Sequence, residues 1–329
     1  MTVSTPLRLV ALALLLPATG LAQDDRSPLP DGVSERRVEI WSEGTRMVGD
    51  LYAPTDLEAE ARVPAIVMSH GWGGTKEHLR RYAPRFAQRG IVVLAFDYRG
   101  WGESDGRLVV DGAMPEPDSS GRVTVRAFEI RDVIDPWDQL LDIGHAIDFI
   151  LGEATVDAQR IGYWGSSYSG AHAIWLAAHE DRLRCVIAQV PAADSVSLTQ
   201  TSWKLDSAEE ILAMASEQAR RQSRGEIPPI PQGTYKAPNL QGWTRLDKVT
   251  TYRPVEDAGL IDIPILVIDA ENEELFDRHG AGELAIERAK RNGAEAVYHV
   301  VPGITHYGIY SEEYETSIEL ALGWWAKHL

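Results

Sequence analysis

From residue 64 onward, short and almost continuous apolar runs alternate with stretches of helical periodicity, and this alternation constrains the fold more than any other feature. The apolar runs span residues 65–68, 91–96, 161–164, 185–190, 265–268 and 296–301. The helical patterns lie near residues 76–88, 136–151, 170–178, 281–292 and 311–328. Strands that are apolar on both faces are typical of a parallel sheet buried between helices. The pattern therefore predicts an α/β fold, with a mostly parallel sheet and helices on both of its faces.

Two segments interrupt this alternation. Residues 105–130 are polar and rich in glycine, proline and aspartate, which predicts a long excursion. Residues 192–258 form a longer insertion between two predicted strands, with a helical pattern near residues 207–224. Because long insertions in such sheets cluster where ligands bind, we expect a helical cap over the sheet; the alternative is a peripheral addition. No linker divides the chain, so residues 36–329 are expected to form one domain that contains this cap.

The N-terminus has the pattern of a secretory signal peptide over residues 1–22. Arg8 precedes an apolar run that ends at Leu16, and small residues follow as far as Ala22. A positive start, a short apolar stretch and small residues at the cleavage point are typical of such peptides. The run is too short to cross a bilayer comfortably, so stable membrane insertion is not expected. We predict export, to the periplasm or the medium, after cleavage near Ala22; a buried N-terminal helix is the alternative.

Charge and cysteine content limit the partners and the covalent chemistry of the chain. The formal net charge is −17, and no cluster of lysine and arginine that could bind phosphates is present, which argues against nucleic acid as a partner. Cys185 is the single cysteine and lies in an apolar run. It can form no internal disulfide, so we expect it to pack in the core.

Ser167 lies at a predicted strand-to-helix turn that suits a nucleophile. A short apolar run ends at Gly165, and a helical pattern begins just after Ser167. A serine on such a turn has a strained backbone, so the residues two positions away on either side must be small. Around Ser167 these residues are Gly165 and Ser169, whereas both flanking side chains of Ser166 would be too large. The usual pattern has glycine where this chain has Ser169.

Two backbone N–H groups are candidates for binding the negative oxygen of a reacting carbonyl. The N–H of Tyr168 follows the predicted nucleophile at a helix N-terminus, where the helix dipole favours negative charge. The second donor should come from the loop after an earlier strand, and we assign it to Trp72, which follows His70-Gly71. His70 itself is expected to shape that loop by hydrogen bonding, because it lies on the oxyanion side of the site.

The general base and the acid that orients it are expected in two later loops. His306 follows the last predicted strand, whereas most of the other histidines fall in or beside predicted helices. A loop at the carboxyl end of a parallel strand is where a base can meet the nucleophile. The acid should follow the strand over residues 265–268, where the four carboxylates of Asp269, Glu271, Glu273 and Glu274 are available. Distance from the strand end favours Glu273, with Asp269 as the main alternative and Glu274 as the next.

These motifs resemble those of the α/β-hydrolase superfamily over nearly all of residues 36–329. His70-Gly71 looks like the oxyanion-loop motif, and residues 96–104 look like the D-x-R-G-x-G-x-S turn. The serine turn is similar to that of the cocaine-esterase and Xaa-Pro-dipeptidyl-peptidase branch, and to that of dienelactone-hydrolase-like proteins. The resemblance implies the α/β-hydrolase fold, in which the residues of the 96–104 turn brace that turn rather than touch substrate.

The resemblance also implies a reaction and a set of roles. It assigns the nucleophile to Ser167, the base to His306 and the acid to Glu273, although the usual acid of the family is aspartate. The expected reaction is acyl transfer from a small, ester-like substrate to water, with no metal and no organic cofactor. A peptidase or amidase of the Xaa-Pro-dipeptidyl-peptidase type is the alternative chemistry, and a non-catalytic binding protein on this scaffold is a third.

Aromatic residues near these motifs predict an apolar pocket for the substrate. The candidates are Trp72, Trp101, Tyr168, Trp203 and Trp243. Each of them could instead pack in the core, which is the ordinary place for a tryptophan or tyrosine.

Overall fold

The computed structural model describes residues 28–227 and 240–329. The predicted signal peptide, residues 1–22, lies outside the described residues. Within the two described ranges, no helix combines the length and the apolar character needed to cross a membrane.

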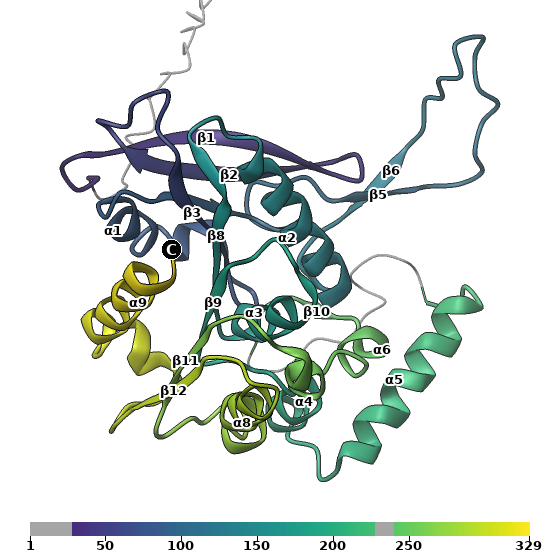
Figure 1. The fold of residues 1–329 in the computed structure, drawn as a ribbon. Coiled ribbons are helices and arrows are strands. Elements are labelled where there is room, and N and C mark those ends of the chain that lie inside the picture. Colours follow the sequence, from purple (N-terminus) through teal and green to yellow (C-terminus); the bar gives the residue numbers. More distant parts are fainter. Residues whose placement is uncertain (1–27, 228–239) are drawn as a thin grey trace, which may run out of the picture.

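An eight-stranded sheet forms the centre of the molecule, in the order β1-β2-β4-β3-β8-β9-β11-β12 (Figure 1). The strands are β1 (Val33–Ser42), β2 (Thr45–Pro54), β3 (Val63–Ser69), β4 (Val92–Phe96), β8 (Val156–Ser166), β9 (Cys185–Gln189), β11 (Ile265–Ala270) and β12 (Ala296–Val301). β1 and β2 pair antiparallel, and β2 joins β4 antiparallel. Every pairing from β4 through β12 is parallel. The predicted α/β fold with a mostly parallel sheet is confirmed.

Helices cover both faces of this sheet (Figure 1). One face packs against α2 (Pro136–Leu151), α3 (Tyr168–His179) and α8 (Leu284–Arg291). The other face packs against α1 (Ala83–Ala87) and α9 (Tyr314–His328). The two resulting apolar layers make up the core, because strands buried on both sides need a cover on each.

The helix expected near residues 76–88 is broken in the structure. A 3-10 turn, Lys76–His78, is separated from α1, which contains Pro84 in its first turn. Proline lacks an N–H group and is tolerated at a helix start but not in a helix interior. Pro84 therefore starts a short new helix instead of continuing a long one.

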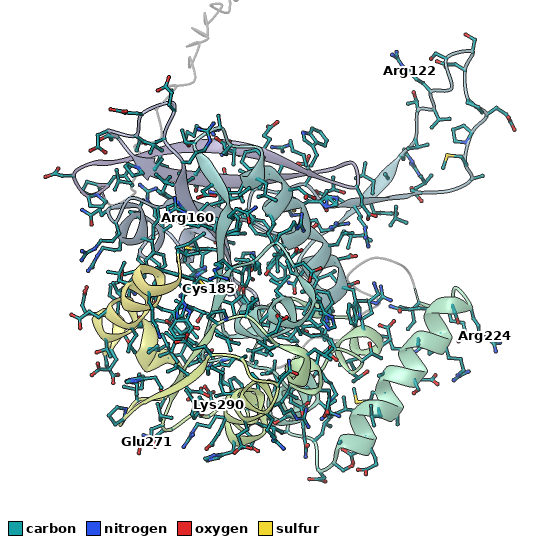
Figure 2. All side chains as sticks on the ribbon, viewed as in Figure 1. Arg122, Arg160, Cys185, Arg224, Glu271 and Lys290 are labelled. Carbon is teal, nitrogen blue, oxygen red and sulfur yellow. The ribbon has the colours of Figure 1, made fainter. Side chains whose placement is uncertain are left out.

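Cys185 lies inside the body of the molecule (Figure 2), fully buried in the core layer that faces α1 and α9. Burial raises the pKa of its thiol to about 12. The cysteine therefore packs in the core, as the sequence predicts, and its thiol stays protonated at neutral pH.

Two segments depart from the central sheet, as the sequence predicts. β5 (Arg107–Val110) and β6 (Ala127–Ile130) form an antiparallel hairpin that extends away from the domain (Figure 1). The insertion between β9 and β11 contains α4 (Ser195–Trp203), α5 (Ala208–Ser223), β10 (Trp243–Thr244), α6 (Leu246–Val249), α7 (Pro254–Asp257) and a 3-10 turn, Ala258–Leu260. β10 pairs with β7 (Val133–Ile134) outside the main sheet. A π-helical turn, His279–Glu283, precedes α8, and a 3-10 turn, His306–Tyr310, precedes α9.

Candidate active site

Ser167 occupies the sharp turn between β8 and α3. Its backbone has φ 58° and ψ −120°, a conformation that L-residues rarely adopt outside strained turns. A Cβ atom on Gly165 would lie 2.1 Å from the carbonyl oxygen of Ser169, so no side chain fits there. This steric limit is the reason why the strained turn requires a glycine two residues before the serine.

His306 lies directly beside the Ser167 hydroxyl. The distance from His306 Nε2 to Ser167 Oγ is 3.1 Å, and that from His306 Nδ1 to Glu273 Oε2 is 2.7 Å. The side chains of His306 and Glu273 are 2% and 1% exposed. Because the carboxylate can only accept, the ring donates from Nδ1, which leaves Nε2 free to accept the proton of Ser167. The structure thus brings the three predicted residues together in one hydrogen-bonded chain.

Glu273 and Glu274, in the loop after β11, accept hydrogen bonds from different groups. The N–H of Leu275 donates to Glu273 Oε1 over 2.9 Å, so each carboxylate oxygen of Glu273 has its own donor. Glu274 does not contact the imidazole ring, but its Oε2 accepts from the backbone N–H of His306 over 2.7 Å. Glu274, an alternative acid by sequence, thus has a role that the sequence does not indicate beyond the run of carboxylates.

Asp269, the main alternative acid, lies within β11 and is fully buried. Its Oδ2 accepts from the hydroxyl of Tyr298 over 3.1 Å, and it forms no hydrogen bond with His306. Burial, together with the nearby charge of Glu273, raises the pKa of Asp269 to about 7. Of the three candidates, only Glu273 is placed to orient the histidine ring.

The loop that follows β3 runs against the serine turn. A Cβ atom on Gly71 would lie 2.8 Å from the carbonyl oxygen of Ser166 and 3.0 Å from Ser167 Cβ. Within the described part of the chain, neither the N–H of Trp72 nor that of Tyr168 donates a hydrogen bond to another residue. Tyr168 directly follows Ser167, and Trp72 directly follows Gly71, whose backbone lies against Ser167, so both predicted donors are close to this serine and available to an acceptor from outside.

His70 shapes this loop, as the sequence predicts. Its Nδ1 donates to the carbonyl of Gly71 over 3.0 Å, and its ring packs against Tyr98 with centroids 4.6 Å apart. Burial lowers the pKa of His70 to about 4, so the ring is neutral at physiological pH. A neutral His70 adds no positive charge to the cavity that it lines, and among the histidines it is His306 that contacts the Ser167 hydroxyl.

The turn that follows β4 is braced by its own polar groups, as the family resemblance implies. Asp97 Oδ1 accepts from the N–H of Lys76 over 2.7 Å, and its Oδ2 accepts from the N–H of Glu103 over 3.0 Å. Arg99 donates from Nε to Asp142 over 2.8 Å. Neither Asp97 nor Arg99 lines the cavity described below, so their role is structural.

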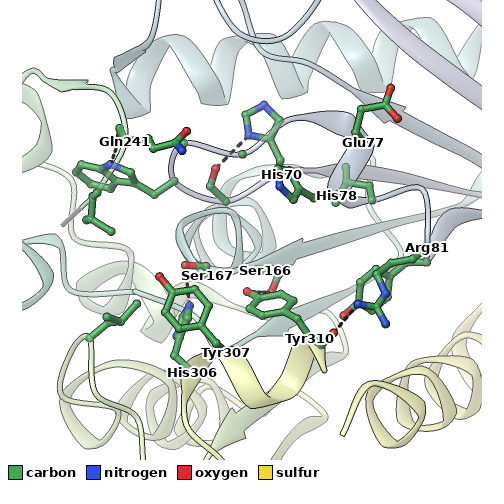
Figure 3. Close-up of a pocket in the computed structure, with 18 of the residues that line it drawn as sticks. His70, Glu77, His78, Arg81, Ser166, Ser167, Gln241, His306, Tyr307 and Tyr310 are labelled. Atoms are coloured by element: carbon green, nitrogen blue, oxygen red, sulfur yellow. Dashed lines mark hydrogen bonds between the residues drawn. The ribbon is translucent and has the colours of Figure 1, made fainter. Parts of the chain in front are cut away.

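A cavity of about 670 Å³ opens onto Ser167 and His306 (Figure 3). Apolar side chains line one part of it: Trp72, Leu79, Leu198, Leu240 and Leu275. Leu198, Leu240 and Gln241 come from the insertion between β9 and β11, and the indole N–H of Trp72 donates to the carbonyl of Gln241 over 2.9 Å. Among the aromatic residues expected to form the pocket, Trp72 lines it. The ring of Trp101 is buried in the core instead, as is that of Tyr168.

Comparison with known proteins agrees with this architecture. The sequence model of the X-Pro dipeptidyl-peptidase (S15) family matches residues 43–227, and that of the prolyl oligopeptidase family matches residues 138–329. The quorum-quenching protein AidA of Acinetobacter baumannii is 33% identical over 49% of this chain and 45% of its own length. Thiohydrolase aneE of Aspergillus aculeatus is 35% identical over 45% of this chain and 39% of its own. The match thus spans less than half the length of either relative.

Solved structures show the same fold at low sequence identity. A hypothetical protein from Pseudomonas aeruginosa superposes with a TM-score of 0.67 at 22% identity, over 92% of this chain and 96% of its own. The α/β-hydrolase GrgF from Penicillium sp. sh18 superposes with a TM-score of 0.65 at 18% identity, over 90% of this chain and 99% of its own. The two family models together cover residues 43–329, and they show to which superfamily the chain belongs. The chain belongs to the α/β-hydrolase superfamily of serine hydrolases, in the part of it that the X-Pro dipeptidyl-peptidase (S15) and prolyl oligopeptidase families represent.

Proposed function

We propose that this hydrolase cleaves carboxylic esters through an acyl-enzyme on Ser167. The observation that supports this most is the chain of hydrogen bonds from Ser167 through His306 to Glu273, at the wall of a cavity of about 670 Å³. In the first step His306 Nε2 takes the proton of Ser167 as Oγ attacks the ester carbonyl. Glu273 accepts the Nδ1–H throughout and stabilises the imidazolium that forms.

The rest of the cycle uses the same groups. The N–H groups of Trp72 and Tyr168 bind the oxygen that becomes negative in the tetrahedral intermediate. As the intermediate collapses, the bond to the alcohol breaks and His306 Nε2 gives its proton to the leaving oxygen. Water then enters, loses a proton to His306 and attacks the acyl carbon. Collapse of the second intermediate releases the acid and returns the proton to Ser167.

The lining of the cavity supports an ester substrate over a peptide. A dipeptidyl-peptidase needs a group that binds the positive N-terminus of its substrate, and a carboxylate is the usual means. In the described part of the cavity wall Glu77 supplies the carboxylate, and it is already paired with Lys76 Nζ over 3.1 Å. Four leucines and two tryptophans line the cavity beside polar residues such as His78 and Arg81, and this apolar part of the wall suits an apolar acyl or alcohol group. Three relatives are named thiohydrolases, and a thioester would react by the same steps.

Labelling with a fluorophosphonate tests the proposal. We expect one covalent adduct, which peptide mass spectrometry locates on Ser167, and none on a Ser167→Ala variant. Hydrolysis of short-chain and long-chain nitrophenyl esters, of a thioester and of an Xaa-Pro-nitroanilide then compares the chemistries. Absence of the adduct on folded protein would refute serine catalysis. An adduct together with cleavage of the nitroanilide alone would refute the ester assignment in favour of a peptidase.

We also propose that the protein is exported after removal of residues 1–22. The support is the charged, apolar and small-residue pattern that ends at Ala22. The intact mass of the protein, expressed with its N-terminus in a bacterial host and recovered from the periplasm or medium, should correspond to a chain that begins at Gln23. Recovery of the full-length chain from the cytoplasm alone would contradict export.

A further inference from the structure

Four buried hydroxyl groups join the serine turn to the strand that leads into the oxyanion loop. Ser69 Oγ, at the end of β3, lies 2.5 Å from Tyr98 OH, 2.5 Å from Tyr163 OH and 2.6 Å from Ser169 Oγ. Tyr163 OH and Ser169 Oγ are 2.8 Å apart. All four residues are fully buried. Because an unpaired buried hydroxyl is costly, this cluster favours one arrangement of the segments that carry the four hydroxyls.

The hydroxyl protons show how the cluster is organised. Each hydroxyl can donate once and accept twice. Ser69, Tyr163 and Ser169 form a closed triangle of three contacts, which is satisfied when each hydroxyl donates to the next in the same rotational sense. Tyr98 then donates to Ser69 from outside the triangle. The four protons therefore serve the four contacts, and the triangle stays complete without Tyr98.

The triangle connects the two segments that carry the proposed oxyanion donors. Ser69 precedes Trp72 by three residues on the oxyanion loop, and Ser169 directly follows Tyr168. Ser69 also pairs in register with Gly165 across β3 and β8. Between these points, Gly71 leaves room for the loop to approach Ser167. The Ser69–Ser169 hydrogen bond is thus a direct link, through side chains alone, between the two sides of the oxyanion site.

We infer that the triangle of Ser69, Tyr163 and Ser169 is a positioning device that sets the spacing between the N–H groups of Trp72 and Tyr168. This inference rests on the proposed function, because it assumes that these two groups bind an oxyanion. It also accounts for the serine at position 169, where the usual motif has glycine: here the hydroxyl closes the triangle, which a glycine would leave open. None of the three side chains lines the cavity, so they act through the backbone that they hold.

Ser169→Ala opens the triangle while keeping the Cβ atom. We expect kcat for a nitrophenyl ester to fall about tenfold with KM changed less than twofold, because a misplaced oxyanion donor weakens transition-state binding more than substrate binding. The inhibition constant of phenylboronic acid, which forms a tetrahedral adduct on the serine, should rise by a similar factor. Ser69→Ala should lower kcat by a larger factor than Ser169→Ala, because Ser69 makes three of the four contacts.

Two variants serve as controls. Ser317→Ala removes a buried hydroxyl of α9 that donates to the carbonyl of Tyr314 and does not line the cavity, and it should lower Tm without changing kcat. Tyr98→Phe removes a hydroxyl of the cluster but leaves the triangle closed, so its effect on kcat should be the smallest of the cluster variants. Assays are run well below the Tm of every variant.

The outcomes separate this inference from the proposed function. If Ser169→Ala loses as much Tm as Ser317→Ala but keeps the kcat and boronic acid affinity of the wild type, the triangle is merely structural and the inference is wrong. The same holds if Tyr98→Phe lowers kcat as much as Ser169→Ala. A wild-type protein that fails to react with a fluorophosphonate at Ser167 would instead overturn the proposed function.

Discussion

Replacing Glu273 with glutamine tests the arrangement of the site, because it exchanges one carboxylate oxygen for an amide nitrogen and changes little else. Glu273 accepts two hydrogen bonds, from His306 Nδ1 over 2.7 Å and from the N–H of Leu275 over 2.9 Å. Glutamine has one carbonyl oxygen, so it can keep only one of these bonds. If the oxygen stays with Leu275, the amide NH2 faces Nδ1, which must then accept. The proton of the ring moves to Nε2, where it blocks removal of the Ser167 proton.

The size of the expected loss follows from that change of tautomer. Enzymes of this mechanism that hold the histidine in the wrong tautomer lose about 10⁴ in kcat. We expect a fall of about 10³ to 10⁴ for Glu273→Gln, equivalent to about 4 to 5.5 kcal/mol of barrier. Asp269→Asn is the matched control, because it makes the same chemical change in the same strand-and-loop segment without touching His306.

For both variants, kcat is measured by steady-state hydrolysis of a short-chain nitrophenyl ester. The rate of fluorophosphonate labelling is a second readout. Far-ultraviolet circular dichroism verifies that they are folded. Near-wild-type turnover of Glu273→Gln together with collapse of Asp269→Asn would refute the reasoning, since it would make Asp269 the acid despite its bond to Tyr298.

Three further predictions concern stability, sterics and reactivity. The pKa of Asp269 is raised from 3.8 to about 7, so the folded state keeps a proton that the unfolded state loses, and the contribution of Asp269 to the free energy of unfolding should fall by up to about 4 kcal/mol between pH 4 and pH 7 and then level off. Urea unfolding at pH 4.5 and 7.5 should show a smaller difference for Asp269→Asn; equal differences would contradict the shift. Gly71→Ala should lower kcat/KM about 100-fold, because its Cβ would lie 2.8 Å from the carbonyl oxygen of Ser166; an unchanged value would show that the loop can move at no cost. Cys185 should react with iodoacetamide only after unfolding, because it is fully buried; modification of native protein would contradict its burial.

The fold and the meeting of Ser167 with His306 could be predicted from the sequence because their signals are local. The end of an apolar run at Gly165 and the start of a helical pattern after Ser167 mark a strand-to-helix turn without reference to the rest of the chain. His306 could be found in a similar way, as a histidine in a loop after a predicted strand. Because the carboxyl ends of parallel strands lie at one edge of the sheet, residues that directly follow different strands come close together in space.

Other features depend on contacts between distant segments and leave no local pattern. Ser69, Tyr98, Tyr163 and Ser169 have no regular spacing, so nothing in the sequence indicates that their hydroxyls meet. The lining of the cavity by residues of the insertion depends on how that segment folds back, which periodicity does not describe. For the same reason the aromatic pocket was only partly predicted: Trp101 looks as suitable as Trp72 until its burial is known.

The carboxylates after β11 have roles that the sequence does not separate. In the sequence they compete for one role, but in the structure each has a different partner. Glu271 Oε2 accepts from the N–H of Gly303, Glu273 accepts from the ring of His306, and Glu274 accepts from the N–H of His306. Three successive bonds therefore join the acid loop to the histidine loop, and they constrain both the backbone and the ring of His306. The acidic run acts as one unit that holds the histidine loop, and of its carboxylates Glu273 is the one that contacts the His306 ring and can set its tautomer.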